Sequence, residues 1–137
     1  MLEKDVVLSK INIIKNCIKA IKSTVNDEVS NLNEFAVENI VVLNLQRACQ
    51  AAIDMAQTTI AYKKLSLPNS YRAAFQILEK DKIISKSSAE AMAKMAGFRN
   101  IAVHEYTEIN LEILKHIVKH HLQEFMKYSE EILNTYK

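Results

Sequence analysis

Only one glycine, Gly97, and one proline, Pro68, interrupt the 137 residues of this chain. Average usage is about 7% glycine and 5% proline, so both residue types are scarce here. Tight turns depend on these two residues more than on any others. A chain so poor in them has few ways to reverse direction sharply, and we expect long helices joined by a small number of connections.

An apolar stripe near the N-terminus supports the helical expectation. Its members follow one another at intervals of four, three, four, three and four residues: Val7, Ile11, Ile14, Ile18, Ile21 and Val25. This spacing places all of them on one face of an α-helix. The sequence therefore predicts a first helix over about residues 2–25.

Breakers and capping residues divide the rest of the chain. Pro68 ends a long second helix, because proline cannot continue a helix, and Asn69 or Ser70 can cap the next one. Ser87 or Ser88 is the expected cap of a fourth helix. We expect helices over about residues 2–25, 33–64, 70–80, 88–104 and 110–136. Short connections favour antiparallel neighbours, so the predicted fold is all-α, an antiparallel bundle of four or five helices.

Composition indicates one ordinary globular domain over residues 1–137, with 49% hydrophobic and 25% charged residues. The net charge of +2 is too small to imply nucleic-acid binding by itself. The N-terminal segment has charges throughout and no apolar signal core. No stretch approaches the roughly 18 apolar residues of a membrane span. We expect a cytoplasmic protein with no membrane segment.

Neither the cysteines nor the histidines are spaced as a metal site. Cys17 and Cys49 show no CxxC or zinc pattern, and we expect reduced, buried thiols. His116 and His120 are four apart and His121 follows, but no carboxylate or cysteine stands beside them at ligand spacing. We expect no metal and no cofactor. A solvated face, or a basic surface that contacts RNA, explains these histidines instead.

The side chains best able to take part in catalysis lie close together in the segment GFRNIAVHEY, residues 97–106. Asn100 and His104 are four apart and share a helix face, and the long side chain of Arg99 can reach the same end. Histidine takes or gives a proton near neutral pH, and arginine matches phosphate oxygens. Together they suit cleavage of an RNA phosphodiester, with histidine deprotonating the 2′-hydroxyl and arginine stabilising the phosphorane-like transition state.

One histidine per chain leaves the departing 5′-oxygen without a proton donor. A symmetric dimer would supply a second histidine and a second arginine across its two-fold axis. The hypothesis therefore predicts a composite site at a dimer interface, no metal, and products with 2′,3′-cyclic phosphate ends. The alternative is that His104 interacts with the helix dipole and that Arg99 forms a surface ion pair with Glu105.

The segment RNIAVHEY resembles the Arg-x4–6-His motif of HEPN-domain ribonucleases. With Tyr106 it has the form Arg-x4-His-x-Tyr, which resembles the HepT toxin branch of that superfamily. The segments NLQRACQAAIDMA and LPNSYRAAFQILEKDKII resemble the framework of the same family. The resemblance therefore extends over nearly the whole chain.

The resemblance implies an all-α homodimer that acts as a metal-independent endoribonuclease toxin. It assigns catalysis to Arg99 and His104, with Asn100 in support. It also implies a partner, a minimal nucleotidyltransferase (MNT-type) antitoxin that adds AMP to Tyr106. Adducts there would add negative charge and bulk beside the catalytic histidine and keep an anionic RNA out of the cleft.

Other polar and aromatic residues have two interpretations each. Arg47 and Asp54, in the second helix, could orient the catalytic groups or form part of the RNA cleft. Alternatively, they form a solvated face or an ion pair at a dimer interface. Tyr62 and Tyr71 flank the proline turn and could stack bases, but we expect them to pack against the end of the bundle.

Two further hypotheses compete with the toxin ribonuclease. In the first, the chain is a non-catalytic helical binding partner of a nucleotidyltransferase, and Tyr106 is only the modified residue. In the second, it is a helical interaction protein with no link to RNA or nucleotides. Both leave the combination of Arg99, Asn100 and His104 unexplained.

Overall fold

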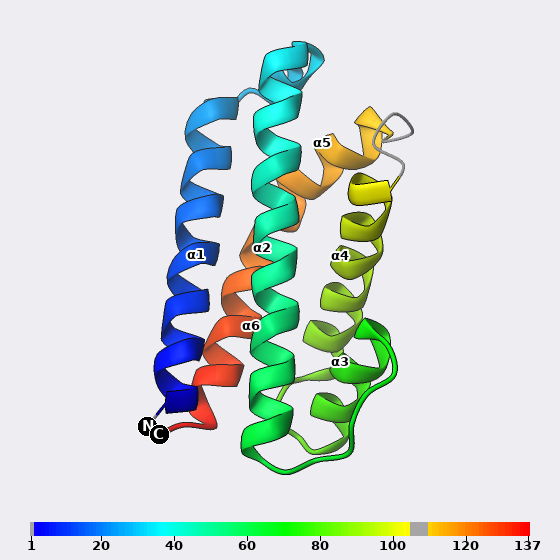
Figure 1. The fold of residues 1–137 in the computed structure, drawn as a ribbon. Helices are drawn as coiled ribbons and strands as arrows, with labels where there is room; N and C mark the ends of the chain where they lie inside the picture. Colours follow the sequence, from blue (N-terminus) through cyan, green and yellow to red (C-terminus); the bar gives the residue numbers. More distant parts are fainter. Residues whose placement is uncertain (1, 105–109) are drawn as a thin grey trace.

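The chain folds into helices throughout its described parts, as a computed structural model shows (Figure 1). The structure describes residues 2–104 and 110–137, and side chains for residues 2–100 and 110–137. Within these ranges there are six α-helices, one short 3-10 helix and no strand: α1 (Leu2–Val25), η1 (Val29–Asn33), α2 (Phe35–Tyr62), α3 (Tyr71–Lys80), α4 (Lys86–His104), α5 (Leu111–His120) and α6 (Leu122–Asn134). The predicted all-α class is confirmed, with more helices than the four or five expected.

The long helices α1 and α2 run antiparallel (Figure 1). Helices α3, α4 and α6 pack against α2, while α5 contacts η1 and α6. Every member of the predicted N-terminal stripe is buried. The core continues through α3 and α6, where the rings of Phe75 and Tyr128 meet edge to face with centroids 5.8 Å apart. The hydroxyl of Tyr128 donates to the carbonyl of Ala52 at 2.7 Å, so this buried polar group is satisfied.

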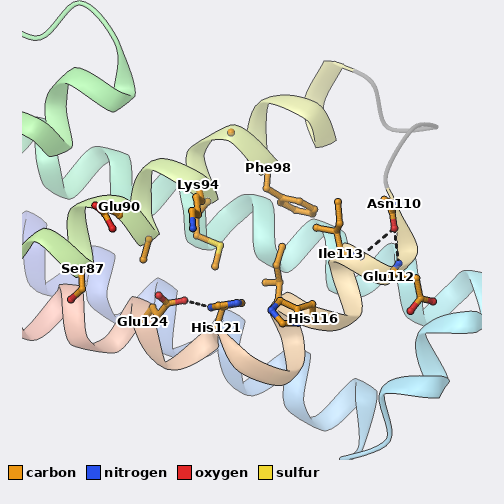
Figure 2. Close-up of a pocket in the computed structure, with 14 residues that line it drawn as sticks. Ser87, Glu90, Lys94, Phe98, Asn110, Glu112, Ile113, His116, His121 and Glu124 are labelled. Carbon is orange, nitrogen blue, oxygen red and sulfur yellow. Dashed lines mark hydrogen bonds and ion pairs between the residues drawn. The ribbon is translucent and has the colours of Figure 1, made fainter.

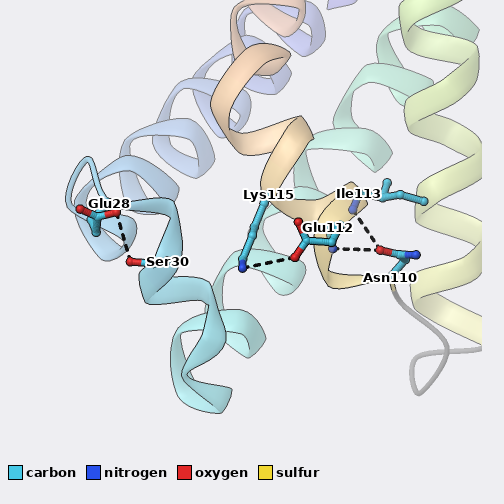
Figure 3. Close-up of polar contacts among 6 residues, drawn as sticks. All are labelled: Glu28, Ser30, Asn110, Glu112, Ile113 and Lys115. Carbon is cyan, nitrogen blue, oxygen red and sulfur yellow. Dashed lines mark hydrogen bonds and ion pairs between the residues drawn. The ribbon is translucent and has the colours of Figure 1, made fainter.

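The connection between α1 and α2 is more ordered than its polar sequence indicated. Asn26 and Asp27 have positive φ angles of 54° and 62°, which these two residue types tolerate better than most. The side-chain amide of Asn31 then donates to the carbonyl of Val25 at 2.8 Å. Leu32, within η1, is completely buried. Because η1 contacts α5, this connection closes one end of the bundle (Figure 3).

Serine residues cap α3 and α4. The predicted cap of α3 is confirmed at Ser70, whose side chain accepts from the amide of Ala73 at 3.0 Å. The predicted start of α4 is wrong by two residues, since the helix begins at Lys86. The hydroxyl of Ser85 accepts a hydrogen bond from the backbone amide of Ser88 at 3.2 Å, which is the contact of an N-cap. The N-cap is therefore Ser85, and not Ser87 or Ser88 as predicted.

The single C-terminal helix predicted over residues 110–136 is wrong, because the chain breaks at His121 into α5 and α6. Neither glycine nor proline marks the break. Two side-chain interactions stabilise the break. The side-chain amide of Gln123 donates to the backbone carbonyl of His120 at 2.6 Å, and Nδ1 of His121 lies 2.5 Å from Oε1 of Glu124. The change of direction lets α5 contact η1 while α6 packs on α1, α2 and α4.

In the part of the chain that the structure describes, no helix combines the length and the apolar character needed to cross a membrane. The two cysteines are free and buried, as expected.

Candidate functional site

The C-terminal part of α4 carries the predicted catalytic residues Arg99 and Asn100. The guanidinium carbon of Arg99 lies 5.9 Å from the centroid of the Tyr71 ring, which comes from the first turn of α3. Nη1 of Arg99 donates to Oδ1 of Asn100 at 3.4 Å, a long and weak hydrogen bond. Asn100 is exposed and Arg99 is half-buried, so both can be reached from solvent.

His104 is the last residue of α4, one helical turn beyond Asn100. Its side chain lies outside the described residues, as do Tyr106 and Glu105. The helical backbone nevertheless places Asn100 and His104 on the same face, since residues four apart are neighbours on a helix surface.

The charge of Arg99 also acts on Cys49, which lies on α2. Burial raises the pKa of the Cys49 thiol to about 12, and the guanidinium of Arg99 opposes part of that rise. Burial dominates, so the thiol stays protonated at neutral pH and is no nucleophile. Arg99, on α4, therefore contacts α3 through the Tyr71 ring, and its charge is felt by a thiol on α2.

Asp54 contacts α1, whereas Arg47 has an exposed side chain. Asp54 pairs with Nζ of Lys10 at 3.1 Å and accepts from the amide of Gln50 at 2.9 Å. Arg47 is exposed, and its charge lowers the pKa of the Cys17 thiol on α1, although burial raises that pKa overall. Neither residue bonds to Arg99 or Asn100 within the described part of the chain. Their role in orienting the catalytic groups stays a prediction.

A groove of about 900 Å³ lies between α4 and the α5–α6 break (Figure 2). Its floor is apolar, with Met95, Phe98 and Ile117 among its lining residues, and its rim carries the His121–Glu124 pair. Neither Arg99 nor Asn100 lines it. At about 100° per residue, Phe98 points about 160° away from Asn100 and about 100° away from Arg99 around α4, so the groove lies on a different face of the helix from these two residues.

His116, His120 and His121, at the C-terminal end of α5 and the break after it, lie with their rings close together. The ring of His116 lies with its centroid 4.8 Å from that of His120 and 4.9 Å from that of His121. Among the side chains that the structure describes, no group of three or more histidine, cysteine or acidic residues is arranged to hold a metal ion.

The surface near these histidines also bears on the possibility of RNA binding. Nζ of Lys115 lies 3.4 Å from Oε1 of Glu112 (Figure 3), which reduces the local positive charge available to RNA.

Two features of the site are not apparent in the sequence. The contact between Tyr71 and Arg99 joins different helices, and no local spacing indicates it. The second is an apolar patch on the first half of α2, where Ile40 is 45% and Leu43 is 54% exposed. Their spacing of three is compatible with a buried helix face as well as an exposed one, so only the structure separates them from the core.

The family model for HepT-like ribonucleases matches residues 14–132 of this chain. The mRNA nuclease HepT of Shewanella oneidensis is 39% identical over 128 residues, which cover 93% of this chain and 96% of that protein. A crystal structure of a toxin–antitoxin with AMP-PNP aligns with a TM-score of 0.89 and 36% identity, over 97% of this chain and 99% of that one. The tri-AMPylated Shewanella oneidensis HEPN toxin, in complex with MNT antitoxin, aligns with a TM-score of 0.88 and 37% identity, over 97% and 98%. The resemblance found in the sequence is thus confirmed, and the chain belongs to the HepT-like ribonuclease family.

Proposed function

We propose that this chain is the toxin of a type II toxin–antitoxin pair, an endoribonuclease that cleaves mRNA in the cytoplasm. The observation that carries the proposal is its 39% identity to an mRNA nuclease HepT over almost the full length of both proteins. Similar solved structures contain a toxin with its antitoxin, which supports the same assignment. The partner that we propose is an MNT-type nucleotidyltransferase.

The chemistry assigned to the site needs no metal. His104 removes the proton of the ribose 2′-hydroxyl, which then attacks the adjacent phosphorus, and the 5′-oxygen leaves with a proton from a second histidine. Arg99 stabilises the charge that develops on the phosphoryl oxygens. Asn100 supports Arg99 through the contact between their side chains. The products are a 2′,3′-cyclic phosphate and a 5′-hydroxyl.

A homodimer supplies the second histidine. The exposed side chains of Ile40, Leu43 and Arg47 share one face of α2, at intervals of three and four residues. A cluster of exposed aliphatic side chains is typical of a protein interface. The first half of α2 extends toward the same end of the bundle as the C-terminus of α4 (Figure 1). Pairing through this face would therefore bring two copies of Arg99 and His104 toward one another.

Control by the partner acts through Tyr106, two residues after His104. Transfer of AMP to its hydroxyl adds a negative charge with each phosphodiester. That charge repels the phosphates of an RNA, and the added nucleotide occupies space beside the catalytic histidine. The tri-AMPylated state of the Shewanella oneidensis toxin supports this proposal.

The test is cleavage of RNA by the purified chain in the presence of EDTA, after its intact mass has shown that no AMP is attached. We expect cleavage with cyclic phosphate ends. His104→Ala and Arg99→Ala should each lower the rate about 100- to 10,000-fold, as loss of an acid–base or charge-stabilising group does.

Matched controls are His120→Ala and Arg72→Ala, which remove an exposed histidine and an exposed arginine on other helices. Both should cleave at the wild-type rate. Full cleavage by folded His104→Ala, or loss of cleavage with EDTA, would contradict the assigned chemistry. An unmodified, folded and inert wild-type dimer would favour the non-catalytic binding partner.

A further inference from the structure

Tyr71 provides an aromatic platform for the guanidinium of Arg99. The distance of 5.9 Å from the guanidinium carbon to the ring centroid lies within the range of a cation–π interaction. Tyr71 is half-buried and packs against the hydrophobic core. Its ring is therefore partly shielded from water, where such an interaction is stronger than at a fully exposed site.

The position of the ring is fixed by the start of α3. Ser70 caps this helix through the amide of Ala73, so the backbone of Tyr71 is held in the first helical turn. Ala74 and Phe75, which follow within that turn, are each only 1% exposed. The first turn of α3 is thus anchored to the core, and the ring that it carries can orient a side chain lying over it.

Among the side chains that the structure describes, few others constrain Arg99. Within residues 2–100 and 110–137 no carboxylate forms an ion pair with it, and its side-chain hydrogen bond to Asn100 is long. A carboxylate partner would orient the guanidinium but would also cancel its charge. An aromatic face orients the guanidinium plane and leaves its hydrogen-bond donors and its charge available to a phosphate.

We propose that Tyr71 is a positioning residue that holds Arg99 in the orientation needed to stabilise the transition state of RNA cleavage. The inference rests on the ribonuclease function proposed above. Tyr71 acts through Arg99 and not through contact with the reacting atoms. The aromatic ring carries the effect, so its hydroxyl should be dispensable.

The test compares Tyr71→Leu and Tyr71→Phe with the wild-type protein in steady-state cleavage of one RNA. We expect Tyr71→Leu to lower kcat about three- to thirty-fold, the range that cation–π strengths imply, with a smaller change in KM. Tyr71→Phe keeps the ring and should remain within about two-fold of wild type. Tyr71→Gln, a polar replacement suited to a half-exposed position, provides a second variant without the ring and should behave as Tyr71→Leu.

A double-mutant cycle separates positioning from a general effect on the fold. Arg99→Lys keeps the charge but loses the planar group that lies over the ring. In this background we expect Tyr71→Leu to have little further effect on kcat, because interacting residues give non-additive effects. The matched control is Tyr62→Leu, which removes another half-buried ring, one that packs on Tyr136 with centroids 4.6 Å apart. It should leave kcat unchanged in both backgrounds.

The outcomes distinguish this inference from the function on which it rests. An inactive wild-type protein would refute the function and the inference together. An Arg99→Ala variant as active as wild type would leave the ribonuclease function standing, but would refute the role of Arg99 and with it the inference. An Arg99-dependent ribonuclease whose folded Tyr71→Leu and Tyr71→Gln variants keep the wild-type kcat refutes the inference alone. Equal loss in the wild-type and Arg99→Lys backgrounds would also overturn it, and would indicate that Tyr71 contacts RNA bases instead.

Discussion

The guanidinium of Arg99 lies over the ring of Tyr71, which comes from α3. On α2, burial raises the pKa of the Cys49 thiol to about 12, and the charge of Arg99 opposes part of that rise. A phosphate that reaches this side of α4 would meet a positive charge that the described neighbours do not cancel. The interaction with an anion is therefore stronger than at an arginine already paired with a carboxylate.

The buried thiol of Cys49 predicts a loss of stability at alkaline pH. Burial raises its pKa from 9.0 to about 12. A group with a raised folded-state pKa binds its proton more tightly in the folded protein. The contribution of this thiol to the free energy of unfolding is therefore complete below pH 9 and is lost as the pH rises toward 12. Burial also raises the pKa of Tyr128 well above its usual 10, which acts in the same direction.

Urea unfolding at several pH values between 7.5 and 10.5 measures this effect. We expect the free energy of unfolding to fall above pH 9, by at most about 1.4 kcal/mol per pH unit for each group. Cys49→Ala removes one of these groups and should make the dependence on pH shallower. An identical dependence in Cys49→Ala would show that the thiol does not ionise on unfolding in this range.

At the scale of the helices, α1 was predictable and the C-terminal break was not. The α1 stripe is a local periodicity, and its burial depends only on one helix face meeting a core. The break at His121 has no glycine or proline, and Leu114, Leu122 and Phe125 continue an apolar pattern across it. The tertiary contacts of α5 with η1 and of α6 with α1 decide where the helix divides.

The same distinction applies to the site. The sequence places Arg99, Asn100 and His104 on one helix, because their spacing is local. The support from Tyr71 could not be predicted, because it depends on how α3 packs against α4.

The start of α5 depends on one side chain. Oδ1 of Asn110 accepts from the amides of Glu112 at 2.9 Å and Ile113 at 3.2 Å (Figure 3). These amides have no partner within the helix. Asn110→Ala should therefore lower the free energy of unfolding by about 1 kcal/mol, measured by thermal or urea unfolding. Asn69→Ala, at an exposed position outside any helix, is the control, and equal losses in both variants would contradict the capping role.

At the scale of the whole molecule, the proposed composite site makes activity depend on association. A monomer has one His104, and the proposed mechanism needs a second histidine to protonate the leaving oxygen. The exposed apolar face of α2 is the surface that we assign to the dimer. Its loss should therefore abolish cleavage without any change at α4.

Leu43→Glu tests this dependence directly. Leu43 is 54% exposed, so a glutamate is tolerated in the monomer but would be costly in a desolvated interface. We expect light scattering after size exclusion to show a monomer, with cleavage reduced at least 100-fold. Leu8→Glu is the matched control, since Leu8 on α1 is 42% exposed and lies outside the proposed interface. It should remain a fully active dimer. A monomeric Leu43→Glu protein that cleaves RNA at the wild-type rate would show that one chain contains the complete site.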